Sequence, residues 1–352
     1  MEYYKRLIIF GPELKVKNMK DNYFQVIRAI CIMAVILIHL KAGTSETGTL
    51  DYWIVFRRII NFPVAVFFFL SGYFVNKNKV KEDSLTFIMT RSLRLLIPLF
   101  IWGFVYNFFS SKDLIFNLTF VARSILGLTA AHLYFIVVLI QLVILTPLLI
   151  KLVDLNNKCI NIFLLSITPL FLIILYIANI VYGINIPYYT TFFVGWFIYY
   201  YLGILLRKLN LDFDKIKTSK LLVLSLISLA ISIGEAFLLK DKAIFLSTTQ
   251  LSFSNIIYSI SLIFLILKVH KTNAISSTNI LVLIGNYSFG IYFIHLAIMK
   301  VVNTYIFDFS NLPEFIAYQT ITFILVLIIS SILVVTGARL LGKKYSKYFG
   351  LC

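Results

Sequence analysis

Residues 24–41 read FQVIRAICIMAVILIHLK, an apolar stretch that carries two ionisable side chains, Arg28 and His39. Each residue of an α-helix turns the chain by about 100°, so two residues eleven apart project from one face, about 16 Å apart along the axis. A charged side chain in hydrocarbon costs about 2.5 to 3.5 kcal/mol on membrane-insertion scales. Because the sequence keeps both groups on one face despite this cost, Arg28 and His39 are the first candidates for a functional site.

The composition places the whole chain in a membrane. Of 352 residues, 60% are hydrophobic and only 13% are charged, a balance that soluble domains of this length do not show. The apolar runs are long enough, at around 20 residues, to cross a hydrocarbon core of roughly 30 Å as helices, and the sequence lacks the alternating pattern of barrel strands. We therefore predict an all-α polytopic helical bundle.

We predict ten transmembrane helices. Their ranges are 24–41, 54–75, 93–109, 132–151, 159–181, 191–206, 219–239, 251–268, 280–302 and 314–341. Segment 113–131 is also apolar, but Asn117, Arg123 and Gly127 interrupt it. We predict that this segment is interfacial or re-entrant and that it does not cross the membrane.

The net charge of +17 reports topology and does not indicate a nucleic-acid partner. With ten spans and a cytoplasmic N-terminus, most lysines and arginines fall on the inside, which is the positive-inside pattern. Both termini are then cytoplasmic, and the chain divides into an N-terminal segment (1–23), a transmembrane domain (24–341) and a C-terminal tail (342–352). The first 20 residues are too charged for a cleaved signal peptide. The cysteines, which are Cys31, Cys159 and Cys352, give no disulfide framework, and no metal site is predicted.

The polar side chains of the spans gather at two levels of the membrane. One group is predicted near the outer surface, and its members are His39, His132, Glu235 and His295. The other is predicted at the inner surface, where Arg91 and Arg94 lie three residues apart and share a helix face. With Arg28 they would form a cationic cluster.

This arrangement permits acyl transfer between the two sides of the membrane. Arginine side chains bind phosphates through paired hydrogen bonds, so the inner cluster could hold an anionic donor such as acyl coenzyme A. A neutral imidazole can take the proton of a hydroxyl that attacks a thioester, and His39 is the candidate base. Simpler interpretations also exist: an interhelical hydrogen bond for His39, a membrane-flanking role for the arginines, and an ion pair of Glu235 with the outer loop that contains Lys240 and Lys242.

Five segments of the chain carry short motifs that combine polar, aromatic and glycine residues. They are Arg28 and His39 with ten residues between them, Val66-Phe67-Phe68-Phe69-Leu70-Ser71-Gly72-Tyr73, Arg91-Ser92-Leu93-Arg94 followed by Pro98, His132-Leu133-Tyr134-Phe135, and Tyr287-Ser288-Phe289-Gly290-Ile291-Tyr292-Phe293-Ile294-His295. Together they cover about residues 20–340 and resemble the acyltransferase 3 family of bacterial integral membrane acyltransferases. The sequence departs from the family at Tyr134, where a Trp usually precedes Phe.

The resemblance implies an enzyme that moves an acyl group, in most cases acetyl, from cytoplasmic acyl coenzyme A to a hydroxyl of a cell-surface polysaccharide or of its lipid-linked precursor. By matching motif, His39 is the catalytic base, Arg28 is its partner, and Arg91 and Arg94 bind the donor. The residues expected in the substrate pocket are Ser71, Gly72, Tyr134, Glu235, Tyr292 and His295. Acetyl coenzyme A is then a substrate and no cofactor is bound permanently. The expected partners are the glycan acceptor, the lipid bilayer of the bacterial cell membrane and glycan-synthesis proteins.

A narrower resemblance keeps a second class of function open. The stretches from Tyr134 to Val138 and from Gly195 to Gly203 resemble a branch associated with exported poly-N-acetylglucosamine, whose members have been described both as exporters and as O-acyltransferases. An exporter or flippase needs a continuous polar path with acidic groups, and the predicted spans contain almost no Asp or Glu apart from Glu235. A structural partner in a glycan-synthesis complex would not explain the register of Arg28 and His39. We therefore expect an acyltransferase.

Overall fold

The computed structural model describes residues 13–111, 118–211, 213–270, 275–306 and 308–351, and all regular structure within them is helical. The long and medium helices are α1 (Glu13–Ile38), α2 (Leu50–Ile60), α3 (Pro63–Tyr73), α5 (Ser84–Ser111), α7 (Tyr134–Asp154), α8 (Lys158–Tyr176), α9 (Phe197–Leu209), α10 (Thr218–Leu239), α12 (Phe253–Val269), α14 (Ser288–Asn303) and α15 (Leu312–Ser346). The shorter elements are α4 (Lys77–Glu82), α6 (Leu118–Ile125), α11 (Ile244–Thr248), α13 (Ile280–Asn286), η1 (Ile177–Val181), η2 (Tyr189–Thr191), η3 (Phe193–Gly195), η4 (Phe213–Lys215) and η6 (Lys347–Phe349).

Among the described residues, seven helical stretches are long and apolar enough to cross a membrane. An eighth arises if α13 and α14 count as one span, although the two bend by 82° at their junction. The other two predicted spans correspond to α1, whose apolar part Asn22–Ile38 is shorter, and to α9, which has 13 residues. The prediction of an all-α polytopic membrane bundle is confirmed, and the count of ten spans stays a prediction.

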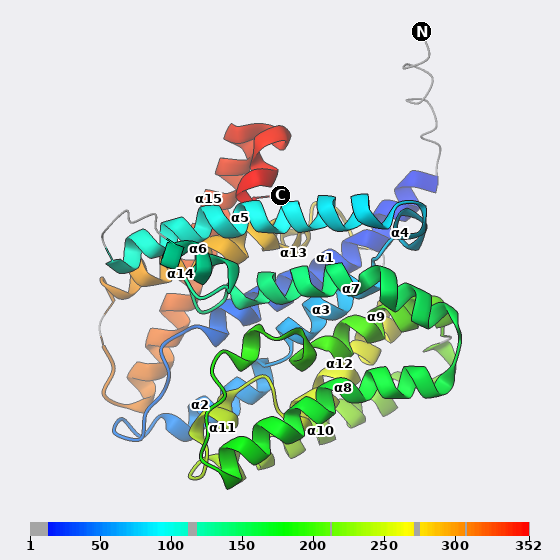
Figure 1. Ribbon diagram of the computed structural model, residues 1–352. Coiled ribbons are helices and arrows are strands. Elements are labelled where there is room, and N and C mark those ends of the chain that lie inside the picture. The colour runs from blue at the N-terminus through cyan, green and yellow to red at the C-terminus, as the bar shows by residue number, and fades with distance from the viewer. Residues whose placement is uncertain (1–12, 112–117, 212, 271–274, 307, 352) are drawn as a thin grey trace.

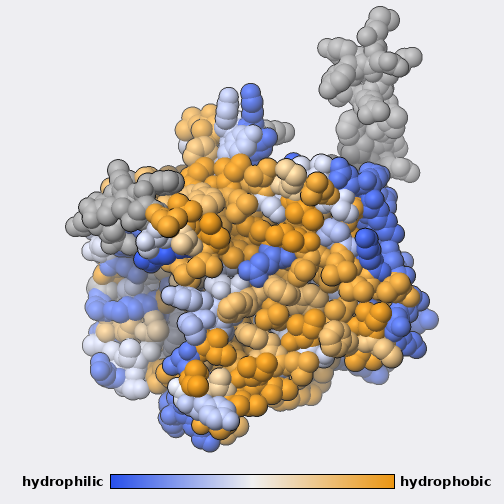
Figure 2. All heavy atoms as spheres, in the orientation of Figure 1, coloured by the Kyte–Doolittle hydropathy of each residue, from blue (hydrophilic) through white to orange (hydrophobic). Residues whose placement is uncertain are grey.

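The outer surface of the bundle suits contact with lipid. Helices α8 and α10 expose large apolar side chains, among them Ile162 at 68% and Leu238 at 78% exposed. Figure 2 shows a broad hydrophobic face with hydrophilic residues gathered toward its edges. A soluble protein rarely exposes so extensive an apolar surface, so these side chains are expected to face the bilayer.

An asparagine marks the start of α8. Asn157 caps α8 by accepting hydrogen bonds from the backbone N–H groups of Cys159 and Ile160, at 2.9 and 3.3 Å, as Asn commonly does at helix starts.

Helix α6 covers eight residues and is too short to cross a bilayer. This agrees with the prediction for segment 113–131, of which 113–117 lie outside the described residues.

Helix α3 lies in the middle of the bundle, in contact with α1 on one side and α9 on the other (Figure 1). Helix α15 contacts α14, and the turn η6 that follows α15 contacts α5. The chain beyond Gly342, where φ is 64°, was predicted as a tail. Instead it returns to the bundle: Leu351 is buried, and the indole N–H of Trp102 donates to the carbonyl of Phe349 at 3.0 Å.

Candidate active site

Two adjoining cavities lie inside the bundle. The first, of about 740 Å³, is lined by His39, His132 and residues of α2, α3 and α7, and we call it the histidine cavity. The second, of about 610 Å³, is lined by Arg91, Arg94 and residues of α3 and α5, and we call it the arginine cavity. Five residues line both cavities and mark their junction. They are Arg28, Ser71, Arg91, Leu139 and Phe289.

The predicted pair on α1 follows this arrangement. His39 lies one residue beyond the last residue of α1 and faces the histidine cavity, whereas Arg28 stands at the junction. Arg28 donates a hydrogen bond to the side-chain oxygen of Gln25 at 3.2 Å and packs 5.9 Å from the ring of Phe74. The eleven-residue spacing therefore places both ionisable side chains along one internal path, as the helical register indicates.

Three histidines meet at the far end of that path. The ring centre of His39 is 6.2 Å from that of His132 and 5.4 Å from that of His295, and the last two are 5.0 Å apart. His132 comes from the loop before α7 and His295 from α14, so the cluster joins three parts of the chain. The sequence analysis placed all three at one membrane level, and the structure brings them together. No group of three His, Cys, Asp or Glu side chains within the described ranges is arranged to hold a metal ion.

Main-chain contacts orient this cluster. Nδ1 of His295 lies 2.7 Å from the carbonyl oxygen of Tyr292, so Nδ1 carries the proton in that contact and Nε2 presents its lone pair. That Nε2 is buried and has no hydrogen-bond partner in the described part of the chain. The hydroxyl of Tyr292 donates to the carbonyl of His132. Tyr292 thus links the loop of His132 to α14 and also lines the histidine cavity.

Arg57 is a cavity residue that the sequence analysis did not select. Its guanidinium donates to the carbonyl of Ile38 at 2.8 Å and to that of Thr248 at 3.0 Å, and it lines the histidine cavity. Ile38 directly precedes His39, so Arg57 fixes the end of α1 and places a positive charge near the candidate base. The sequence signal was available: two adjacent arginines inside an otherwise apolar stretch from Leu50 to Tyr73.

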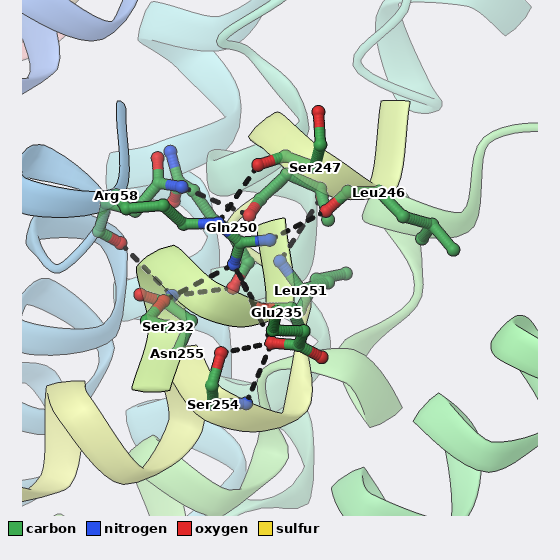
Figure 3. Close-up of polar contacts among 12 residues, drawn as sticks. Arg58, Ser232, Glu235, Leu246, Ser247, Gln250, Leu251, Ser254 and Asn255 are labelled. Carbon is green, nitrogen blue, oxygen red and sulfur yellow. Dashed lines mark hydrogen bonds and ion pairs between the residues drawn. The ribbon is translucent and has the colours of Figure 1, made fainter. Parts of the chain in front are cut away.

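The neighbouring Arg58 is fully buried and holds α2 against α10, α11 and α12 (Figure 3). It donates to the carbonyls of Leu246 and Ser247 at 2.9 Å each and to the hydroxyl of Ser252. The Glu235 carboxylate lies 3.9 Å from this guanidinium. Such a buried cation is tolerated because its hydrogen bonds and counter-charge replace water.

Glu235 belongs to this network and not to a cavity. It accepts a hydrogen bond from the hydroxyl of Tyr176 at 2.6 Å and others from the backbone N–H and hydroxyl of Ser254. The prediction that Glu235 lies in the substrate pocket is therefore wrong, because Glu235 lines neither cavity. The alternative pairing with the outer loop is not observed either: Lys240 pairs with Asp51 instead.

The remaining predicted pocket residues divide into lining and packing positions. His295 is a packing position, because it contacts the other two histidines but lines neither cavity, contrary to its predicted place in the substrate pocket. Tyr134 lines the histidine cavity and stacks on Trp196, with ring centres 5.7 Å apart. The hydroxyl of Ser71 donates to the carbonyl of Phe67 at 2.8 Å while the residue lines both cavities. The prediction that Gly72 lies in the substrate pocket is wrong, because Gly72 packs against α9 and lines neither cavity. A Cβ there would lie 2.1 Å from the carbonyl oxygen of Tyr200.

The charge of both cavities is positive. Arg91 stands at the junction, Arg94 lines the arginine cavity alone, and a further cation, Lys347, lines that cavity too. Neither cavity is lined by Asp or Glu within the described residues. The path is therefore suited to an elongated ligand that carries negative charge at the arginine end and reaches His39 and His132 with its other end.

Comparison with known proteins gives the family. A family model described as an acyltransferase domain matches residues 21–338. A protein named probable poly-beta-1,6-N-acetyl-D-glucosamine export protein, from Staphylococcus aureus strain MSSA476, is 26% identical over an alignment of 304 residues that covers 82% of this chain and 84% of that protein. An O-acetyl transferase of Shigella phage Sf6 is 26% identical over an alignment of 102 residues that covers 26% of this chain and 30% of that protein. No solved structure matches. Because the domain covers most of the chain, this multi-pass membrane protein belongs to the acyltransferase family.

Proposed function

We propose that the protein transfers an acyl group, acetyl in the first instance, from acyl coenzyme A to a hydroxyl of a cell-surface polysaccharide or of its lipid-linked precursor. The observation that supports this best is the pair of adjoining cavities, with arginines at one end and histidines at the other. Acyl coenzyme A has the matching polarity, since its phosphates and its thioester lie at opposite ends. Arginine forks bind such phosphates well.

The orientation follows from the positive-inside pattern. If the N-terminus is cytoplasmic, the arginine cavity opens toward the cytoplasm, where acyl coenzyme A is made, and the histidine cavity lies toward the outer surface. The acceptor would then arrive from outside or from the outer leaflet of a bacterial plasma membrane. Glycan-synthesis proteins that deliver the polymer are the partners that this placement implies.

The proposed reaction is a direct acyl transfer. His39 accepts the proton of the acceptor hydroxyl as the hydroxyl oxygen attacks the thioester carbonyl carbon. A C–O bond forms, and the negative charge that develops on the former carbonyl oxygen is stabilised by the guanidinium of Arg57, a fixed charge in a site shielded from water. The C–S bond then breaks, and the proton on His39 passes to the thiolate of coenzyme A. Arg28 at the junction positions the donor between the two cavities.

The acceptor class rests on the relatives and on the cavity wall. One relative is named for poly-beta-1,6-N-acetyl-D-glucosamine and another as an O-acetyl transferase, which supports O-acylation of a glycan. The stacked rings of Tyr134 and Trp196 give the histidine cavity an aromatic wall. A sugar ring could rest on such a wall while polar groups fix its orientation.

The relatives' name also supports a second candidate, a polysaccharide exporter or flippase. A 740 Å³ chamber could hold part of a glycan. Against this candidate, the lining of both cavities includes no carboxylate among the described residues, although several arginines line them. A cationic path matches an anionic donor better than a neutral or amino-containing polymer.

The test is release of coenzyme A from acetyl coenzyme A by the purified protein with candidate glycans, comparing the native chain with His39→Ala. Removal of a general base is expected to lower turnover by roughly 10²- to 10⁴-fold. His270→Ala is the matched control, because His270 packs 4.6 Å from the ring of Phe24 and lines neither cavity. Equal turnover in the native and His39→Ala proteins would reject the mechanism. Polymer transport into vesicles without any coenzyme A release would favour the exporter.

A further inference from the structure

Lys347 lines the arginine cavity from a part of the chain far from the three arginines. It begins η6, after the break of α15 at Gly342, and it faces the same space as Arg94. The sequence analysis assigned this region to a tail outside the transmembrane domain. The cavity therefore has a cation that neither the motifs nor the family resemblance selects.

The segment that carries Lys347 is held against the bundle at two points and closed by a hydrogen bond within itself. Trp102 on α5 donates to the carbonyl of Phe349 at 3.0 Å. The backbone N–H of Leu351 donates to the carbonyl of Ser346 at 3.0 Å, and the Leu351 side chain is buried. These contacts close residues 346–351 into a turn that packs against α5. Lys347 is consequently presented at the cavity and does not hang from a free tail.

Gly350 makes this docking possible. Its φ of 69° lies in the left-handed region that residues with a side chain disfavour. A Cβ at Gly350 would lie 2.7 Å from the ring of Phe293 and 3.2 Å from Pro98. A larger residue would therefore have to lift the turn from α5 and α14, which gives a way to undock Lys347 without changing its charge.

The order of cations along the path indicates which part of a donor Lys347 would meet. Arg28 and Arg91 line both cavities, whereas Arg94 and Lys347 line only the arginine cavity, away from the histidines. If the thioester lies at His39, the opposite end of acyl coenzyme A must lie at the Arg94 end. That end is a nucleotide with a 3′-phosphate on its ribose, and a lysine ammonium binds phosphate as a point charge.

We propose that Lys347, presented by the docked turn of residues 346–351, binds the 3′-phosphate of the acyl coenzyme A donor. This inference rests on the proposed function and adds to it the site for the distal end of the donor. The packing of this turn against α5 brings Lys347 to the same cavity that Arg91 and Arg94 of α5 line. The contact is electrostatic and open to solvent, so added salt should weaken it.

The experiment measures equilibrium binding of coenzyme A and of 3′-dephospho coenzyme A to the purified full chain in detergent. Lys347→Gln should weaken coenzyme A binding about fivefold at low salt, a size expected for an exposed charge contact. It should leave binding of the dephospho compound unchanged, because that compound lacks the group that Lys347 contacts. Lys344→Gln is the matched control: Lys344 is also exposed, contacts the Tyr345 ring, and does not line the cavity.

A second variant tests the turn. Gly350→Val should reproduce the loss for coenzyme A, and adding Lys347→Gln to it should cause no further loss. An equal loss for both ligands, or no loss in Lys347→Gln, would overturn the inference while leaving the donor assignment intact. If the native chain binds neither ligand, the proposed donor itself is wrong and the inference falls with it.

Discussion

Replacing the buried Arg58 by methionine should destabilise the protein strongly. The change removes two hydrogen bonds to main-chain carbonyls, at 2.9 Å each, and two to the hydroxyls of Ser232 and Ser252. It also leaves the Glu235 carboxylate without the cation that lies 3.9 Å away. Removing one member of a buried ion pair costs about 3 to 5 kcal/mol. Because Glu235 keeps donors from Tyr176 and Ser254, we expect a loss near the lower value, about 3 kcal/mol.

The assay is thermal unfolding of the purified protein in one detergent at a fixed scan rate, followed by intrinsic fluorescence. A chain of this size shifts by roughly 2 °C per kcal/mol, so Arg58→Met should lower the apparent Tm by about 6 °C. Lys242→Met, at an exposed lysine, should leave it unchanged. With Glu235→Gln added, the combined loss should be smaller than the sum of the two single losses. A native Tm for Arg58→Met, or strictly additive losses, would refute the reasoning.

Three further predictions concern other parts of the molecule. Gly72→Ala should sharply lower the yield of monodisperse protein, because its Cβ would lie 2.1 Å from a backbone oxygen of α9, whereas Gly234→Ala, with nothing within 4 Å, should express normally. Arg57→Gln should lower kcat by roughly 100-fold, with little change in the KM for the donor, and Arg57→Lys should restore part of the rate. Lys41 donates to Asp308 and holds the pKa of that carboxyl below its usual value. The stability from this pair is therefore present above about pH 4 and is lost as the pH falls through the lowered pKa, so Asp308→Asn should reduce the dependence of Tm on pH in that acidic range.

Several features of the candidate site follow from local sequence geometry. A helix fixes the angle between two of its residues, so the shared direction of Arg28 and His39 could be predicted from their spacing alone. The spacing of Arg91 and Arg94 likewise predicted a common face, and both line the arginine cavity. The membrane level of the histidines could be predicted from the order of the spans. In these cases, the position of each residue along its helix was enough to predict that the side chains lie near one another.

Other features depend on how helices rotate and pack, which depth does not determine. Glu235 was predicted at the same membrane level as the histidines, yet α10 turns it toward Tyr176 and Arg58 and away from the cavities. Gly72 was predicted to shape a pocket, but the absence of a side chain at this position instead allows α3 to pack closely against α9. The turn that contains Lys347 follows a stretch with several basic residues, which is typical of a tail, and only its contacts with α5 show that it is part of the bundle.

The adjacent arginines of α2 show how structural and chemical roles are coupled in this site. Consecutive helix residues project about 100° apart, so Arg57 faces the histidine cavity while Arg58 points into the interface with α10 and α12. Fixing Arg58 by its buried network therefore fixes the rotation of α2, and with it the contact of Arg57 with the carbonyl before His39. Substitution of Arg58 should consequently reduce acyl transfer although this side chain lines neither cavity. Its loss of activity should follow the loss of folded protein, whereas Arg57→Gln should lose activity at an almost native Tm, and this difference separates the residue that positions α2 from the residue that acts on the substrate.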